Sequence, residues 1–323
     1  QRNDVALLVF DPDTTVAGVF TQSAFRAAPV QIAEERLQAD GVRALLINSG
    51  NANAATGDHG MEDALALCRA AAEALALPET AVLPFSTGVI GERLPVASMV
   101  PVIQTLPTGL GADRWLQAAE AIMTTDTVAK ALSLQIELSG KTVTITGMAK
   151  GSGMIRPDMA TMLAYVCTDA DISSACLKQL LVAATNRSFN RITVDGDTST
   201  NDAFIVAATG QAGNAPIEDP ASEEAALLLA GLTSVAQSLA QAIVRDGEGA
   251  TKFVTVAVAG GADEAECLEV AYTVAESPLV KTALFASDPN WGRLAMAIGR
   301  ADVRNLDPAG VQVFFDDVQV MQD

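Results

Sequence analysis

The sequence predicts an α/β fold in which mixed or antiparallel sheets pack between helices. Hydrophobic residues make up 50% of the 323 residues, enough to bury one large core or two ordinary ones. β-rich runs and helical patterns are intermixed along the chain, and neighbouring β-rich runs are separated by short turns. Because tight turns join antiparallel strands whereas parallel strands need long crossovers, these turns argue against a doubly wound parallel sheet.

The expected helices cover residues 61–77, 115–123, 173–187, 223–244 and 277–286, and two further short helices are expected to end over residues 34–39 and at residue 300. The expected strands cover residues 4–10, 14–20, 42–47, 81–85, 132–138, 142–147, 191–194, 203–208 and 253–258. Two hairpins are predicted, 4–10 with 14–20 and 132–138 with 142–147. Residues 211–220 are rich in Gly, Ala, Asn and Pro, which predicts a linker before a second lobe.

Composition and charge exclude several functions. A formal net charge of −19 argues against a nucleic-acid partner, because phosphate attraction needs clustered Lys and Arg. The four cysteines form no CxxC pair, which argues against a zinc site or a disulfide framework. No unbroken apolar run reaches the roughly 18 residues of a membrane span, and the N-terminus lacks a signal-peptide pattern. We therefore expect a cytoplasmic protein with no membrane partner, incomplete at its C-terminus, where residues 311–323 stop inside a strand-like run.

Residues 149–170 join a glycine-containing loop to an apolar segment. Gly151, Ser152 and Gly153 form the loop, and residues 159–166 are almost wholly apolar. Thr161, preceded by the small Ala160, lies where the two halves meet. Such a threonine is either a cap or turn residue or a nucleophile at the edge of a packed core.

The rest of the sequence offers few catalytic groups. The only histidine, His59, has no recognisable partner, so Ser-His-Asp or Cys-His catalysis would depend on one loop residue. Asp195 and Asp197 have a DxD spacing but no EF-hand pattern around them, and we expect no metal. A hydroxyl nucleophile needs no histidine if cleavage before Thr161 frees its α-amine, whose pKa of about 7.7–8.0 suits a base. On spacing alone, a structural threonine bonded to the backbone remains the better explanation.

Nine segments favour a nucleophilic Thr161 over a structural one, because together they resemble the ornithine (glutamate N-) acetyltransferase family of arginine biosynthesis. In chain order they are 16–21 (VAGVFT), 48–53 (NSGNAN), 86–91 (STGVIG), 123–127 (MTTDT), 150–155 (KGSGMI), 159–163 (MATML), 189–202 (FNRITVDGDTSTND), 246–252 (DGEGATK) and 288–293 (DPNWGR). They run over nearly the whole chain and occur in the family's order.

The resemblance implies a self-cleaving fold of the ornithine acetyltransferase and aminopeptidase type. Cleavage between Ala160 and Thr161 would give an α chain of residues 1–160 and a β chain of residues 161–323. The two chains would share an intertwined core and assemble as an α2β2 heterotetramer. The implied reaction moves acetyl from N2-acetylornithine to glutamate by a ping-pong route through an acetyl-Thr161 ester. No cofactor or metal is implied, and the use of acetyl-CoA as a second acetyl donor stays open.

The resemblance also assigns residues. Thr161 is the nucleophile, and Thr87 and Gly88 form the oxyanion hole in a loop that leaves a strand. Thr124, Lys150, Thr161 and Glu248 contact substrate. These residue types suit amino-acid substrates, since a lysine matches a carboxylate and a glutamate matches an ammonium group. Lys150 would also hold the Thr161 amine neutral by like-charge repulsion.

Two residues depart from the family pattern, and two other functions stay open. Arg156 and Asp158 stand where the family has small or neutral residues, which leaves the rate of cleavage open. The second function is a self-cleaving aminopeptidase or amidohydrolase, in which water replaces glutamate as acceptor. The third is a non-catalytic protein with a structural Thr161.

Overall fold

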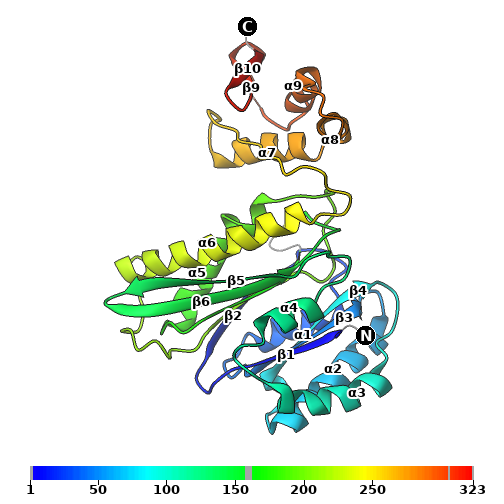
Figure 1. Cartoon of the computed structure of the whole chain (residues 1–323), viewed down its shortest axis with the longest axis vertical. Coiled ribbons are helices and arrows are strands. Elements are labelled where there is room, and N and C mark those ends of the chain that lie inside the picture. The colour runs from blue at the N-terminus through cyan, green and yellow to red at the C-terminus, as the bar shows by residue number, and fades with distance from the viewer. Residues whose placement is uncertain (1–2, 157–161, 305, 322–323) are drawn as a thin grey trace. The chain divides into compact units, whose positions relative to one another are not determined.

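The structure, a computed structural model, describes residues 3–156, 162–304 and 306–321. The chain divides into two compact units (Figure 1). The first consists of Gln1–Ile192 and Asp197–Glu248, and the second of Thr193–Gly196 and Gly249–Asp323. Residues 211–220, where a linker was expected, lie inside the first unit between its last strand and its last helix.

The first unit contains two sheets and six α-helices among its described residues. Its strands are β1 (Val5–Val9), β2 (Thr15–Phe20), β3 (Ala44–Asn51), β4 (Val82–Val89), β5 (Lys130–Leu138), β6 (Lys141–Lys150), β7 (Leu163–Thr168) and β8 (Ala203–Ala208). Its helices are α1 (Ala28–Arg36), α2 (Gly57–Leu75), α3 (Val96–Thr105), α4 (Trp115–Ala121), α5 (Ser174–Asn186) and α6 (Glu223–Arg245).

Both sheets of the first unit mix parallel and antiparallel pairs. The three-stranded sheet has the order β1-β3-β4, with β1 and β3 antiparallel and β3 and β4 parallel. The five-stranded sheet has the order β2-β8-β7-β6-β5, in which only β7 and β8 run parallel. Helices α5 and α6 cover one face of the five-stranded sheet, and α2 and α3 pack on the three-stranded sheet (Figure 1). The predicted fold class is confirmed.

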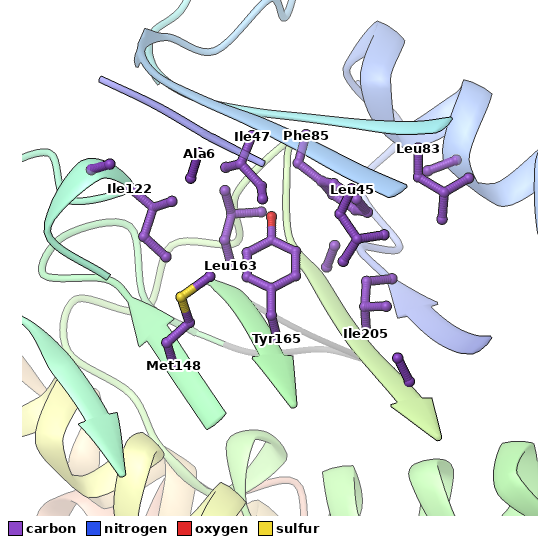
Figure 2. Close-up of a cluster of buried hydrophobic side chains, with 14 of the residues drawn as sticks. Ala6, Leu45, Ile47, Leu83, Phe85, Ile122, Met148, Leu163, Tyr165 and Ile205 are labelled. Atoms are coloured by element: carbon purple, nitrogen blue, oxygen red, sulfur yellow. The ribbon is translucent and has the colours of Figure 1, made fainter. Parts of the chain in front are cut away.

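The two sheets face each other across a core of buried hydrophobic side chains. Side chains alternate along each strand, so β7 directs Leu163 and Tyr165 toward the three-stranded sheet, where Leu45 and Phe85 meet them (Figure 2). The rings of Phe85 and Tyr165 pack edge to face with centroids 5.3 Å apart. The Tyr165 hydroxyl is buried in this core and has no hydrogen-bond partner among the described residues. This apolar layer fixes the strand ends that carry the site.

Helix α6 is the one described helix long and apolar enough to cross a membrane, by length and composition alone. Its apolar face is buried against β5 and β6. Contact is close because Gly231 of α6 lies against Ile145, while Gly147 of β6 lies against Val235 and Leu239. The helix therefore covers the core of the first unit, and its hydropathy reflects that packing.

The second unit contains α7 (Glu264–Ala275), α8 (Pro278–Phe285) and α9 (Trp291–Gly299). Their apolar residues meet in a small cluster around Val270, Val280 and Ala297. Two short antiparallel strands, β9 (Val313–Phe315) and β10 (Val318–Met321), follow. The helix expected over 277–286 is confirmed as α8.

Several local predictions are wrong, although most elements are confirmed. The hairpin at 132–138 and 142–147 is present as β5 and β6. The runs at 4–10 and 14–20 form strands, but β1 pairs with β3 and β2 pairs with β8, so they make no hairpin. Residues 191–194 and 253–258 form no strand, and α3 and α7 were not anticipated. Hydrophobic patterns indicate which face of a strand is buried, whereas its neighbour is chosen by tertiary packing.

Candidate active site

A single cavity of the first unit brings together every predicted site residue that the structure describes. It has a volume of about 680 Å³ and opens where β4 and β6 end and where β7 and β8 begin. Its lining includes Thr87, Gly88, Thr124, Lys150 and Glu248. These residues come from four segments far apart in the sequence.

Thr87 and Gly88 belong to β4, which runs on to Val89, so the expectation of a loop at this point is wrong. Parallel pairing with β3 continues to the strand end and sets Gly88 beside Gly50. Gly88 has a φ of +130°, and a Cβ atom there would lie 2.3 Å from the carbonyl carbon and oxygen of Gly50. Only glycine fits this backbone, because any side chain would meet the neighbouring strand.

Lys150 is the last residue of β6 and is buried. Its Nζ atom donates to Oγ1 of Thr87 at 3.1 Å and to Oγ1 of Thr124 at 2.9 Å. Burial lowers the pKa of Lys150, while the carboxylates of Asp126, Asp202 and Glu248 oppose this effect. An ammonium group can only donate, so Thr87 accepts here and keeps its own hydroxyl proton to donate into the cavity.

Glu248 lies just beyond the end of α6 and is exposed at the cavity. Its backbone N–H donates to the carbonyl oxygen of Ser152 at 2.8 Å. A Cβ atom on Gly153 would lie 2.6 Å from Oε1 of Glu248, so the glycine allows the carboxylate to lie against the 151–153 loop. The cavity thus contains a buried cation on one segment and an anion on another.

The predicted cleavage residues Ala160 and Thr161 lie outside the described residues, as does Asp158. Met162, which follows Thr161 in the chain, lines the cavity. Its carbonyl oxygen accepts a hydrogen bond from the backbone N–H of Ala203 at 2.9 Å. The described chain that continues from Thr161 is therefore anchored to the first residue of β8 at the cavity wall.

Asn201 and Asp202 also line the cavity and were not predicted as site residues. Asn201 Nδ2 donates to the carbonyl oxygens of Ala52 at 2.6 Å and of Ser86 at 2.9 Å, just before Thr87. Asp202 is 3% exposed, burial raises its pKa, and its Oδ2 atom has no hydrogen-bond partner among the described residues. Both residues belong to the polar 189–202 segment, and its match to the family was the sequence signal that could have identified them as site residues.

The other candidate groups of the sequence lie outside the cavity lining. His59 is exposed on α2, with Nδ1 3.2 Å from Oε2 of Glu62, as expected for a surface residue. In the part of the chain that the structure describes, no three His, Cys, Asp or Glu side chains gather as metal ligands would. The cysteines are free, and burial raises the pKa of the Cys68 thiol to about 11.

Comparison with known proteins agrees with the motifs and the site. A model of the ArgJ family matches residues 1–323. The chain belongs to the ArgJ family. The arginine biosynthesis bifunctional protein ArgJ of Pseudomonas syringae pv. tomato is 51% identical over 317 residues, which cover 98% of this chain and 78% of that protein. The protein of the same name from Pseudomonas fluorescens is equally similar. The resemblance found in the sequence is confirmed.

Two solved structures are also similar to parts of the chain. The arginine biosynthesis bifunctional protein argJ of Bacillus halodurans is 39% identical, covers 50% of this chain and 84% of its own, and has a TM-score of 0.47. Ornithine acetyltransferase of Mycobacterium tuberculosis, solved with ornithine, is 35% identical with coverages of 49% and 84% and a TM-score of 0.43.

Proposed function

We propose that this ArgJ-family enzyme of arginine biosynthesis is an ornithine acetyltransferase that moves acetyl from N2-acetylornithine to glutamate. The observation that carries the proposal is the convergence of Thr87, Gly88, Lys150 and Glu248 on one cavity that Met162, the neighbour of Thr161, also lines. A cation and an anion in one cavity suit substrates that carry both a carboxylate and an ammonium group.

In the first half-reaction, Oγ of Thr161 attacks the acetyl carbonyl carbon of N2-acetylornithine. The hydroxyl proton passes to the α-amine that cleavage after Ala160 frees. The Gly88 N–H and the Thr87 hydroxyl stabilise the oxyanion of the tetrahedral intermediate. When the intermediate collapses, the C–N bond breaks, the α-ammonium returns its proton to the leaving nitrogen, and ornithine departs. The acetyl group remains as an ester on Thr161.

In the second half-reaction, the amine of glutamate attacks the ester and the same groups act in reverse. Lys150 binds the substrate carboxylate in both half-reactions, and Glu248 binds the unreacting side-chain ammonium group of N2-acetylornithine in the first, while Thr124 donates or accepts a further hydrogen bond. Each proton taken in one half-reaction is given back within it, so the route needs neither a cofactor nor a metal ion. A bound acetyl group is handed from amine to amine without release as acetate.

The assembly and location follow from the same proposal. The α chain (1–160) and the β chain (161–323) stay associated, and two such pairs form an α2β2 heterotetramer in the cytoplasm. Strand pairing supports the association, because β6 precedes and β7 follows the cleavage position and the two lie side by side. Acetyl-CoA as donor is tested separately, by following glutamate acetylation with acetyl-CoA in place of N2-acetylornithine.

The decisive experiment is denaturing electrophoresis with N-terminal sequencing of the smaller fragment. Wild type should give two bands with a fragment that begins at Thr161, Thr161→Ser should still be cut, and Thr161→Ala should stay whole. Cut wild type should move acetyl from N2-acetylornithine to glutamate. A single uncut band from active wild type would refute the mechanism, and release of free acetate in place of N-acetylglutamate would favour a hydrolase.

A further inference from the structure

Three buried charges lie directly behind the cavity wall without lining it. Lys130 Nζ is 2.8 Å from Oδ1 of Asp126 and 2.6 Å from Oδ2 of Asp246. The side chains of Lys130, Asp126 and Asp246 are 1%, 0% and 6% exposed. They belong to the start of β5, the turn after α4 and the end of α6. Charges buried to this degree persist only with partners, so the cluster locks three segments together.

Asp126 connects the cluster to the cavity through the backbone. Its Oδ2 atom accepts from the N–H of Thr124 at 3.0 Å, and its Oδ1 atom accepts from the N–H of Gly151 at 2.8 Å. Thr124 lines the cavity, and Gly151 follows Lys150 in the chain. One carboxylate therefore holds the two segments whose side chains form the Lys150–Thr124 hydrogen bond.

Asp246 makes the matching connection to Glu248. Its carboxylate accepts from both the N–H and the hydroxyl of Thr127, and its backbone carbonyl accepts from Ser152 Oγ at 2.6 Å. The Ser152 carbonyl in turn accepts from the Glu248 N–H. The segment that carries Glu248 is thus fixed against the loop that follows Lys150.

We infer that Asp126 is a positioning residue which, through Lys130 and Asp246, holds Thr124, Lys150 and Glu248 in the arrangement that binds the charged ends of an amino-acid substrate. The inference rests on the proposed function for the identity of that substrate. Burial raises the pKa of Asp126, but Lys150, Lys130 and the two N–H groups together lower it below its ordinary value, so the residue is an anion at neutral pH.

Electrostatics distinguish this role from plain structural support. The charged groups that act on Lys150 are Asp126, Asp202 and Glu248, which favour its protonated form, and Lys130, which disfavours it. Removing the charge of Asp126 should therefore move the alkaline limb of kcat/KM to lower pH. Removing the charge of Lys130 should move the same limb to higher pH.

The test compares Asp126→Asn, Lys130→Met and the matched control Asp63→Asn. Asp63 is also a nearly buried carboxylate, paired with Arg93 at 2.6 Å, but it lies on α2 and does not line the cavity. Asp126→Asn should raise KM about 10- to 100-fold, the loss expected for hydrogen bonds to a charged group, with a smaller change in kcat. Lys130→Met should also raise KM, and the two variants should shift the alkaline limb in opposite directions. Asp63→Asn should move neither.

Two results overturn the inference. One is an Asp126→Asn enzyme with the KM and alkaline limb of wild type, and the other is a change no larger than that of Asp63→Asn. Amide hydrogen exchange provides a readout that needs no activity, since the N–H groups of Thr124 and Gly151 should exchange faster in Asp126→Asn. If the wild-type enzyme moves no acetyl, the proposed function alone is refuted. In that case, unchanged exchange of the Thr124 and Gly151 amides in Asp126→Asn would refute the positioning role.

Discussion

Replacing Gly88 by alanine tests the oxyanion hole most directly. An alanine Cβ at this position would lie 2.3 Å from the Gly50 carbonyl and 2.8 Å from the N atom of Asn51. Both contacts are backbone atoms that no side-chain rotation can clear. The end of β4 would have to move about 1 Å from β3 to restore ordinary van der Waals distances.

The magnitude follows from two separate effects. The φ of +130° is unfavourable for alanine and costs about 1–3 kcal/mol of folding stability. The 1 Å movement carries the Gly88 N–H away from the oxyanion, and losing one such donor lowers kcat by about 10²–10³. Stability and activity should therefore both fall, for different physical reasons.

The matched control is Gly41→Ala. Gly41 has a φ of +105°, and a Cβ atom there would meet nothing within 4 Å, so this variant has the backbone strain without the clash. Urea unfolding should show a similar stability loss from strain in both variants, with an added loss in Gly88→Ala. Acetyl transfer to glutamate should drop only in Gly88→Ala. Equal kcat values for the two variants would refute the role of Gly88 as an oxyanion donor.

Three further predictions concern buried polar groups. Tyr165→Phe should leave urea stability unchanged or raise it by about 1 kcal/mol, because it removes a buried hydroxyl without a described partner, and a loss of similar size would reveal a hidden bond. Because burial raises the pKa of Asp202, the free energy of unfolding should decline as the pH rises from the ordinary aspartate pKa through the pKa of Asp202 in the folded protein. Urea unfolding at several pH values should show that Asp202→Asn abolishes this decline. An unaltered pH profile in the variant would contradict the prediction. Burial lowers the pKa of Lys150, so as the pH is raised, KM for glutamate should begin to increase before the ordinary lysine pKa is reached. A KM that stays constant up to the ordinary lysine pKa would count against carboxylate binding by Lys150.

The sequence predicted local structure well and partnerships poorly. The run 203–208 is β8 and the helix over 223–244 is α6, because apolar periodicity and flanking polar residues are local signals. The pairing of β1 with β3 was missed, because the three-residue turn at 11–13 before the next β-rich run indicated a hairpin. Sheet neighbours depend on packing between distant segments, which hydrophobic pattern alone does not encode.

The same limit applies to the site. Lys150 and Glu248 were found because each lies in a glycine-bounded motif that matches a known family. Asp126, Lys130 and Asp246 were not singled out, since Lys130 and Asp246 are separated by 116 residues and meet only in the folded chain. Buried ion pairs carry no spacing signature, so the family motifs predicted several cavity-lining residues but not the charged residues that support them.

The strand order β2-β8-β7-β6-β5 has a kinetic consequence for a chain cut before Thr161. The inner strands β8 and β7 would belong to one fragment, and β2, β6 and β5, which flank them on both sides, would belong to the other. Neither fragment can leave without opening two hydrogen-bonded ladders at once, so dilution should not separate them. Once unfolded, however, the fragments must find each other again, and recovery becomes a second-order process that depends on concentration. The cut would convert refolding from a unimolecular process into a bimolecular one. The chain would therefore have to fold before it is cleaved.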